Sequence, residues 1–221
     1  MATVTIGGNS GDDHSGTEDC FLKQADSSSS YDTGTSFEVT KYGANDYSHG
    51  AVKFSGIDSL PDSLAVSSAT LYLYQEANGG VGAYNVVAKK FERDWVIGET
   101  SWDYWKTTGG NQSWTTGGAL HETDDRSSTT TFDVSVDMVN ESKSFSTAQL
   151  ATDVEDMADG GHGNYGWHLE RGDSGEDTDW KRFTSIEGSD GNRPYLSVTY
   201  TEPSAGNIIP HLIHRQFMAR R

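Results

Sequence analysis

The stretch Ala69-Thr70-Leu71-Tyr72-Leu73-Tyr74 decides the fold class, because it alternates two kinds of large side chain. Successive side chains of a β-strand point to opposite faces, so Leu71 and Leu73 share one face while Tyr72 and Tyr74 share the other. A period of two over a short run is typical of a strand with one buried face. We therefore predict a strand here, with one of these faces toward a core and the other toward a loop or solvent.

Similar short runs recur along the chain between clusters of turn residues. They occupy residues 20–22, 36–39, 51–54, 84–91, 131–134, 165–169, 183–186 and 194–200. This number and spacing of strands is typical of a two-sheet sandwich. The composition of the 221 residues, 33% hydrophobic and 11% aromatic with 25 glycines, favours short strands and tight turns over long helices. The sequence predicts an all-β, jelly-roll-like, two-sheet antiparallel β-sandwich.

One segment has helical spacing. Ser146 or Thr147 can cap its start, Leu150, Val154 and Met157 recur at helical intervals, and two glycines follow. We predict one short helix on the flank of the sandwich.

The charge is strongly negative and unevenly distributed. The chain has 33 acidic and 16 basic residues, a formal net charge of −17. From residue 203 onward the charged side chains are Arg215, Arg220 and Arg221, which leaves −20 on residues 1–202. This distribution disfavours nucleic acid and anionic membranes as partners.

Cys20 is the single cysteine of the chain, which excludes an internal disulfide and a multi-cysteine zinc site. Its apolar neighbours predict a buried, unreactive side chain.

No secretory signal is visible near Met1, and no window approaches the ~18 apolar residues of a membrane span. We expect either a protein assembled into a particle from a cytoplasm or a piece of a longer chain.

The order of several motifs points to a family. They are Glu18-Asp19-Cys20-Phe21-Leu22, Tyr31-Asp32-Thr33-Gly34, Val52-Lys53-Phe54, Ser67-Ser68-Ala69-Thr70-Leu71-Tyr72-Leu73, Asp94-Trp95, Glu99-Thr100-Ser101-Trp102, Phe132-Asp133-Val134, Asn164-Tyr165-Gly166-Trp167-His168-Leu169, Ser185-Ile186-Glu187 and Arg193-Pro194-Tyr195-Leu196-Ser197-Val198-Thr199-Tyr200. Together they resemble the DNRLRE family of β-sandwich domains, which is related to carbohydrate-binding modules and occurs in secreted, cell-surface and some phage-encoded proteins. The resemblance implies a jelly-roll fold and a non-catalytic role, but no particular ligand.

We divide the chain into an N-terminal segment (1–17), a DNRLRE-like sandwich (18–201), a linker (202–207) and a docking tail (208–221). The tail combines apolar and basic side chains: Ile208, Ile209, Leu212, Ile213, Arg215, Phe217, Met218, Arg220 and Arg221. Such a stretch is costly to expose, so we expect it to pack on its own sandwich or to enter a groove on another subunit or virion protein. Pro210 and the short length of the tail disfavour binding to a membrane surface.

The residues for catalysis are not in recognisable arrangements. The histidines lack a His-x-x-x-His or His-Glu-x-x-His spacing, and no nucleophile elbow is present, so we predict no enzymatic activity and no required cofactor. An acidic loop offers carboxylates for a structural calcium ion, at Asp173, Glu176, Asp177 and Asp179. The alternative for this loop is a solvated acidic surface.

Four aromatic residues surround a glycine-rich loop: Trp102, Tyr104, Trp105 and Trp114. Flat rings exposed beside polar groups can stack on sugars, so these are our candidates for a glycan-binding surface. The alternative is that they pack over an edge of the sandwich. Trp95 and Trp167 lie in strand-like contexts and are expected in the core.

Two functional hypotheses follow. The first is a non-enzymatic structural or adhesion component of a tailed-phage virion, a head-decoration or tail-associated protein anchored by the tail. The alternative is a carbohydrate-binding module of a secreted or cell-surface protein, acting outside the cell on environmental or cell-surface glycans.

Overall fold

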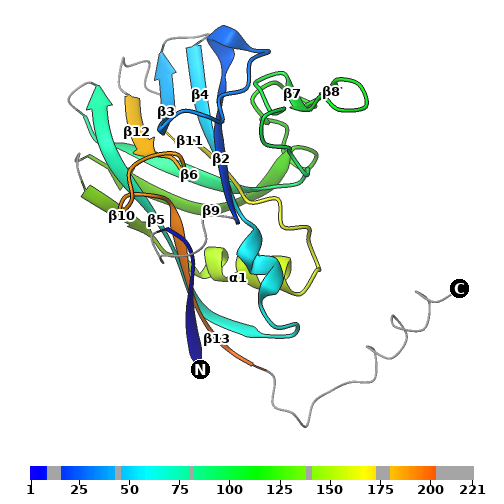
Figure 1. Ribbon diagram of the computed structural model, residues 1–221, viewed down its shortest axis with the longest axis vertical. Coiled ribbons are helices and arrows are strands. Elements are labelled where there is room, and N and C mark those ends of the chain that lie inside the picture. Colours follow the sequence, from blue (N-terminus) through cyan, green and yellow to red (C-terminus); the bar gives the residue numbers. More distant parts are fainter. Residues whose placement is uncertain (9–15, 43–45, 80–81, 138–140, 173–179, 203–221) are drawn as a thin grey trace, which may run out of the picture.

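The architecture was obtained from a computed structural model, which describes residues 1–8, 16–42, 46–79, 82–137, 141–172 and 180–202. It is mostly β, with 50% strand and 11% helical residues, and its antiparallel sheets curl around a common core (Figure 1). The predicted all-β sandwich is confirmed.

The described residues form thirteen strands, one α-helix and two short 3₁₀ helices, η1 (Gln24–Asp26) and η2 (Ser55–Ser59). The strands are β1 (Ala2–Gly7), β2 (Thr17–Lys23), β3 (Ser36–Tyr42), β4 (Asp46–Phe54), β5 (Ala65–Gly79), β6 (Tyr84–Phe91), β7 (Tyr104–Lys106), β8 (Gln112–Ser113), β9 (Arg126–Val136), β10 (Glu141–Phe145), β11 (Trp167–Arg171), β12 (Trp180–Thr184) and β13 (Tyr195–Thr201). The helix is α1 (Ala148–Ala158).

The long strand β5 links the two halves of the sandwich. Its first half pairs with β13, which pairs in turn with β1, while β10 pairs with the opposite edge of β5. The end of β5 pairs with β12, from which the order continues through β3, β4, β11 and β6 to β9. Strand β2 pairs with β4, and β7 and β8 form a separate hairpin. All of these strand pairings are antiparallel.

The N-terminal boundary differs from the prediction. Residues 2–7 form β1 along the whole of β13, and Ile6 is buried in the core. The run Ala2-Thr3-Val4-Thr5-Ile6 has the period of two that is typical of a strand. The sandwich therefore begins near residue 2 and not at residue 18.

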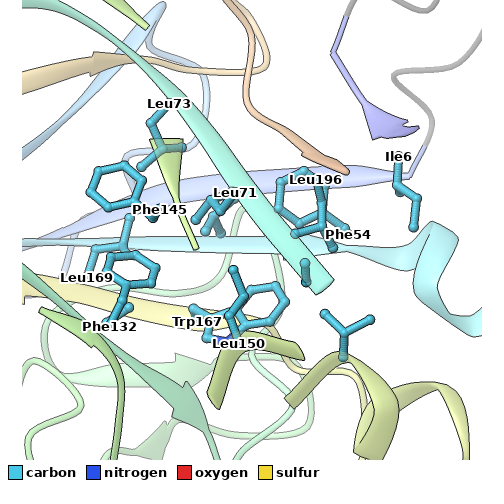
Figure 2. Close-up of a cluster of buried hydrophobic side chains, with 14 of the residues drawn as sticks. Ile6, Phe54, Leu71, Leu73, Phe132, Phe145, Leu150, Trp167, Leu169 and Leu196 are labelled. Atoms are coloured by element: carbon cyan, nitrogen blue, oxygen red, sulfur yellow. The ribbon is translucent and has the colours of Figure 1, made fainter. Parts of the chain in front are cut away.

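The main core lies between the two halves of the sandwich. Leu71 and Leu73 are fully buried there while Tyr72 and Tyr74 are half-buried, as the alternation predicts. Figure 2 shows the leucines of β5 meeting aromatic and aliphatic side chains from both sheets and from α1, among them Phe54, Phe132, Phe145, Trp167 and Leu196. Trp167 and Trp95 are both fully buried, as predicted, and so is Cys20.

The predicted helix is confirmed. The Thr147 side chain caps it by accepting a hydrogen bond from the backbone N–H of Leu150 (3.0 Å). Leu150, Val154 and Met157 form its buried stripe, and Figure 1 shows the helix beside β5 and β9. Within the described residues no helix has the length and apolar character needed to cross a membrane.

Candidate functional site

Residues 92–125 connect β6 to β9 and form what we term the cap. The cap packs Trp95, Trp102, Trp114 and Ala119 onto the outer face of the sheet, forming a second hydrophobic cluster with residues of β2, β4 and β6. The hairpin β7–β8 belongs to this segment and lies to one side of the sheet in Figure 1. The cap therefore gives one sheet a second buried face.

Asp125 stabilises the end of the cap through hydrogen bonds. Its buried carboxylate accepts hydrogen bonds from the backbone N–H groups of Thr115 and Thr116 and from Arg93 Nε, each at 2.9 Å. A buried carboxylate is stable when several donors satisfy it, so this contact holds three parts of the cap together.

The four predicted glycan-stacking residues do not form one exposed platform. Trp102 is 6% exposed and Trp114 is 4% exposed, since both contribute to the second hydrophobic cluster. Tyr104 and Trp105 are half-buried on β7, and the Arg93 guanidinium lies 5.9 Å from the centre of the Trp105 ring. The prediction of an exposed glycan-binding surface is therefore wrong for Trp102 and Trp114. Both rings cover an apolar face of the sheet, and burial of that face stabilises the fold. Tyr104 and Trp105 remain candidates for glycan binding.

The other predicted sites cannot be compared with the structure. Asp173, Glu176, Asp177 and Asp179 lie outside the described residues, and so does the docking tail, with Ile208, Ile209, Leu212, Ile213, Arg215, Phe217, Met218, Arg220 and Arg221.

Beneath the cap the structure brings together two histidines. Nε2 of His168 lies 3.1 Å from Nδ1 of His49, and both nitrogens lie within 3.1 Å of the backbone oxygen of Gly118 in the cap. Both side chains are almost fully buried, and His49 also packs against the ring of Trp102 at 5.0 Å. The histidine pair is therefore part of the contact between sheet and cap.

Arg126 fixes the hydrogen positions in this cluster. Its Nη1 lies 3.2 Å from Nδ1 of His168 and 2.7 Å from the carboxylate of Glu170. A guanidinium only donates, so Nδ1 of His168 accepts and the imidazole proton is on Nε2, directed toward Gly118 and His49.

The same contact decides whether the cluster suits a metal ion. Ligand atoms of His49, His168 and Glu170 lie within 4.8 Å of one another, close enough to share a cation. A metal on Nε2 of His168 would move the proton to Nδ1, where it would face the Arg126 donor. The guanidinium also adds a positive charge beside the ion. These residues therefore fit a hydrogen-bonded network and not a divalent cation.

The surroundings keep both histidines neutral. Burial lowers the pKa of His168 well below its ordinary value, and electrostatic interactions with His49, Arg126 and Lys89 lower it further. Burial also lowers the pKa of His49, although the Glu170 carboxylate acts in the opposite direction. Sequence reasoning missed this cluster, because its histidines are 119 positions apart and follow no metal-binding spacing.

A second buried titratable group lies on β2. Asp19 is 1% exposed and accepts a hydrogen bond from the backbone N–H of Ile186 (2.7 Å). Burial raises the pKa of its carboxyl to about 8, with a further contribution from Glu187. At neutral pH this carboxyl carries its proton.

The fold defines the class of protein as an all-β sandwich with a capped outer sheet. No protein-family model matches the sequence. No curated protein matches it with significant similarity either.

Proposed function

We propose that this chain is a non-enzymatic structural and adhesion component of a tailed-phage virion, a head-decoration or tail-associated protein held in the particle by residues 208–221. The resemblance to DNRLRE domains motivates the proposal, and the all-β sandwich agrees with the fold that this resemblance implies. The apolar and basic tail supplies the anchor.

The observation that carries the proposal is the surface of the sandwich. Among the described residues, Met1 is the single large hydrophobic side chain that is exposed. An apolar tail therefore has no exposed apolar patch to cover on the described part of its own domain, which favours a groove on another molecule. Thr201 and Glu202 are both exposed, so the chain leaves the sandwich at its surface just before the tail.

The energies are sufficient for a stable contact. Burying an Ile, Leu, Phe or Met side chain contributes about 1.5–3 kcal/mol, from which the cost of ordering the segment is subtracted. The three tail arginines favour an acidic surface on the partner, while the charge of −20 on residues 1–202 discourages unspecific association between copies.

The test is incorporation of variants into particles. A chain ending at residue 202, and a full chain with Ile209→Glu and Ile213→Glu, should both fold and both be lost from purified virions, as measured by mass spectrometry. A matched control places the same change of two charges in the linker, Ser204→Glu with Asn207→Glu, and should be incorporated normally. Unchanged incorporation of the truncated chain would refute the anchoring role.

The alternative function is glycan binding by a carbohydrate-binding module. The observation that favours it at the cap is the partial exposure of Tyr104 and Trp105 next to the Arg93 guanidinium. Trp105→Ala should then weaken binding on a glycan array without changing the melting temperature. Trp102→Ala is not a suitable control, because Trp102 is buried and its loss destabilises the cap.

A further inference from the structure

The outer face of one half of the sandwich carries many side chains with hydroxyl groups. It is formed by β1, β13, β5 and β10, on the side opposite the core, and we call it the hydroxyl face. Its members are Thr3, Thr5, Ser67, Ser68, Thr70, Tyr72, Tyr74, Ser142, Ser144, Tyr195, Ser197 and Thr199. Every one of these side chains ends in, or carries, a hydroxyl group.

The strand registers place these residues side by side. Ser197 is opposite Thr5 of β1 and Thr70 of β5, so three strands present hydroxyl groups in one row. In the next row Tyr72 is opposite Tyr195 and Ser144. Residues directly opposite in antiparallel pairs share a face, and the intervening residues, such as Leu71 and Leu196, are buried in the core.

The face is open to solvent in the described structure. Thr3, Thr5, Ser68 and Ser144 are exposed, and the remaining members are exposed or half-buried. Rows of hydroxyl groups are spaced by the strand separation of about 4.8 Å in one direction and by about two residue rises, roughly 6.6 Å, in the other. The hydroxyl groups therefore repeat along the strands and across them.

Two of its three tyrosines form an aromatic pair. The rings of Tyr72 and Tyr195 stack at 4.3 Å with an angle of 9° between their planes. Two rows away the hydroxyls of Thr3 and Thr199 lie 3.0 Å apart. Stacked tyrosines hold a fixed orientation and offer apolar ring surface beside polar hydroxyls, which is the combination that sugars contact.

The charge of the face decides between classes of ligand. None of the residues named above is Asp, Glu, Lys, Arg or His, although residues 1–202 carry a net charge of −20, and the next outward position of β5 after Tyr74 is Glu76. Nucleic acids, phosphates and anionic lipids require cations, which the face lacks. Hot spots of protein interfaces are enriched in Trp, Tyr and Arg, whereas the tyrosines of this face are half-buried and its exposed side chains are serines and threonines. An uncharged partner rich in hydroxyl groups satisfies both donors and acceptors without burying charge.

We propose that the hydroxyl face binds neutral polysaccharide chains. The proposal rests on glycan binding, the alternative function above, but assigns it to the sheet opposite the cap and not to Tyr104 and Trp105. Serine and threonine hydroxyls donate to and accept from the sugar hydroxyls, while Tyr72 and Tyr195 contact the apolar faces or edges of the sugar rings.

The experiment measures depletion of the full chain from solution by insoluble neutral polysaccharides, namely cellulose, chitin and starch, with alginate and polygalacturonate gels as acidic counterparts. Ser197→Lys places a long charged side chain in the middle of the face and should weaken retention at least about tenfold, which corresponds to 1.4 kcal/mol. Tyr72→Ala should weaken it as well. The matched control is Thr129→Lys, at an exposed position of β9 outside the face, and should bind as the wild type.

The outcomes separate this proposal from the function on which it rests. Retention that survives Ser197→Lys but is lost in Trp105→Ala keeps glycan binding and overturns the hydroxyl face. Retention of the wild type by none of the neutral polysaccharides overturns both. A dimer in sedimentation equilibrium that disappears in Ser197→Lys would identify the face as a contact between copies and would also overturn the proposal. Should Ser197→Lys fail to fold, Ser144→Lys at an exposed position of β10 takes its place.

Discussion

Nε2 of His168 lies 3.1 Å from Nδ1 of His49, which joins strands β11 and β4 beneath the cap. The contact is buried, and Arg126 donates to the other side of the His168 ring. Protonation of His168 would turn Nδ1 into a donor facing a donor, beside the charges of Arg126 and Lys89, with Glu170 as the nearby anion. The cap contact therefore depends on a neutral histidine pair.

Acid should destabilise the protein through this pair. Because the pKa of His168 in the folded state is below its ordinary value of 6.5, the unfolded chain takes up protons first as the pH falls. Stability should decline below pH 6.5, by at most about 1.4 kcal/mol per pH unit for each histidine, until the folded-state pKa is reached. His168→Gln, which retains one acceptor and one donor, should flatten this dependence in urea unfolding between pH 5 and 8. Equal slopes in both proteins would contradict the prediction.

Asp19 should have the opposite pH dependence. Its folded-state pKa of about 8 lies above the ordinary value of 3.8, so the folded state holds a proton that the unfolded state releases. Its contribution to stability is complete below about pH 4 and is lost as the pH rises toward 8. Asp19→Asn keeps an acceptor for the Ile186 N–H and should raise the free energy of unfolding at pH 8 by on the order of 1–3 kcal/mol. A variant equally destabilised at pH 5 and pH 8 would show that the carboxyl has another role.

Gln75 is a buried amide whose removal should stabilise the fold. It is fully buried on the core side of β5, and neither its oxygen nor its nitrogen has a hydrogen-bond partner among the described residues. An unsatisfied buried amide costs about 1–3 kcal/mol. Gln75→Leu should therefore raise the melting temperature in differential scanning calorimetry. Gln149→Leu is the contrasting variant, since Gln149 donates to Asp153 at 2.9 Å, and it should lower the melting temperature.

Asp153 should be among the most sensitive positions of α1. Its buried carboxylate accepts hydrogen bonds from Thr131 Oγ1 (2.6 Å), Gln149 Nε2 (2.9 Å) and Trp167 Nε1 (3.1 Å), which tie the helix to β9 and β11. Asp153→Ala leaves these donors unsatisfied and should cost about 2–4 kcal/mol in chemical denaturation. The same change at exposed Asp156, one turn later, should cost less than about 1 kcal/mol. Similar losses for both variants would argue against a special role for the buried network.

The sequence alone determined the features that depend on neighbouring residues. The alternation of leucine and tyrosine between Ala69 and Tyr74 predicted a strand with one buried face, which is the face of Leu71 and Leu73. Thr147 and the stripe through Leu150 predicted the helix. These signals are local, because the period of side chains along one strand or helix is set by backbone geometry. The burial of Trp95 and Trp167 followed from the same patterns.

Tertiary structure alone decided which distant residues meet. It buried Trp102 and Trp114 by folding the cap over an apolar sheet face, and it paired His49 with His168 across 119 positions. It also aligned Thr5, Ser197 and Thr70 in one row. The alternation along each strand predicts which side chains share a face, but the order and register of the strands depend on packing across the whole sandwich. The hydroxyl face and the histidine cluster exist only once those pairings are made.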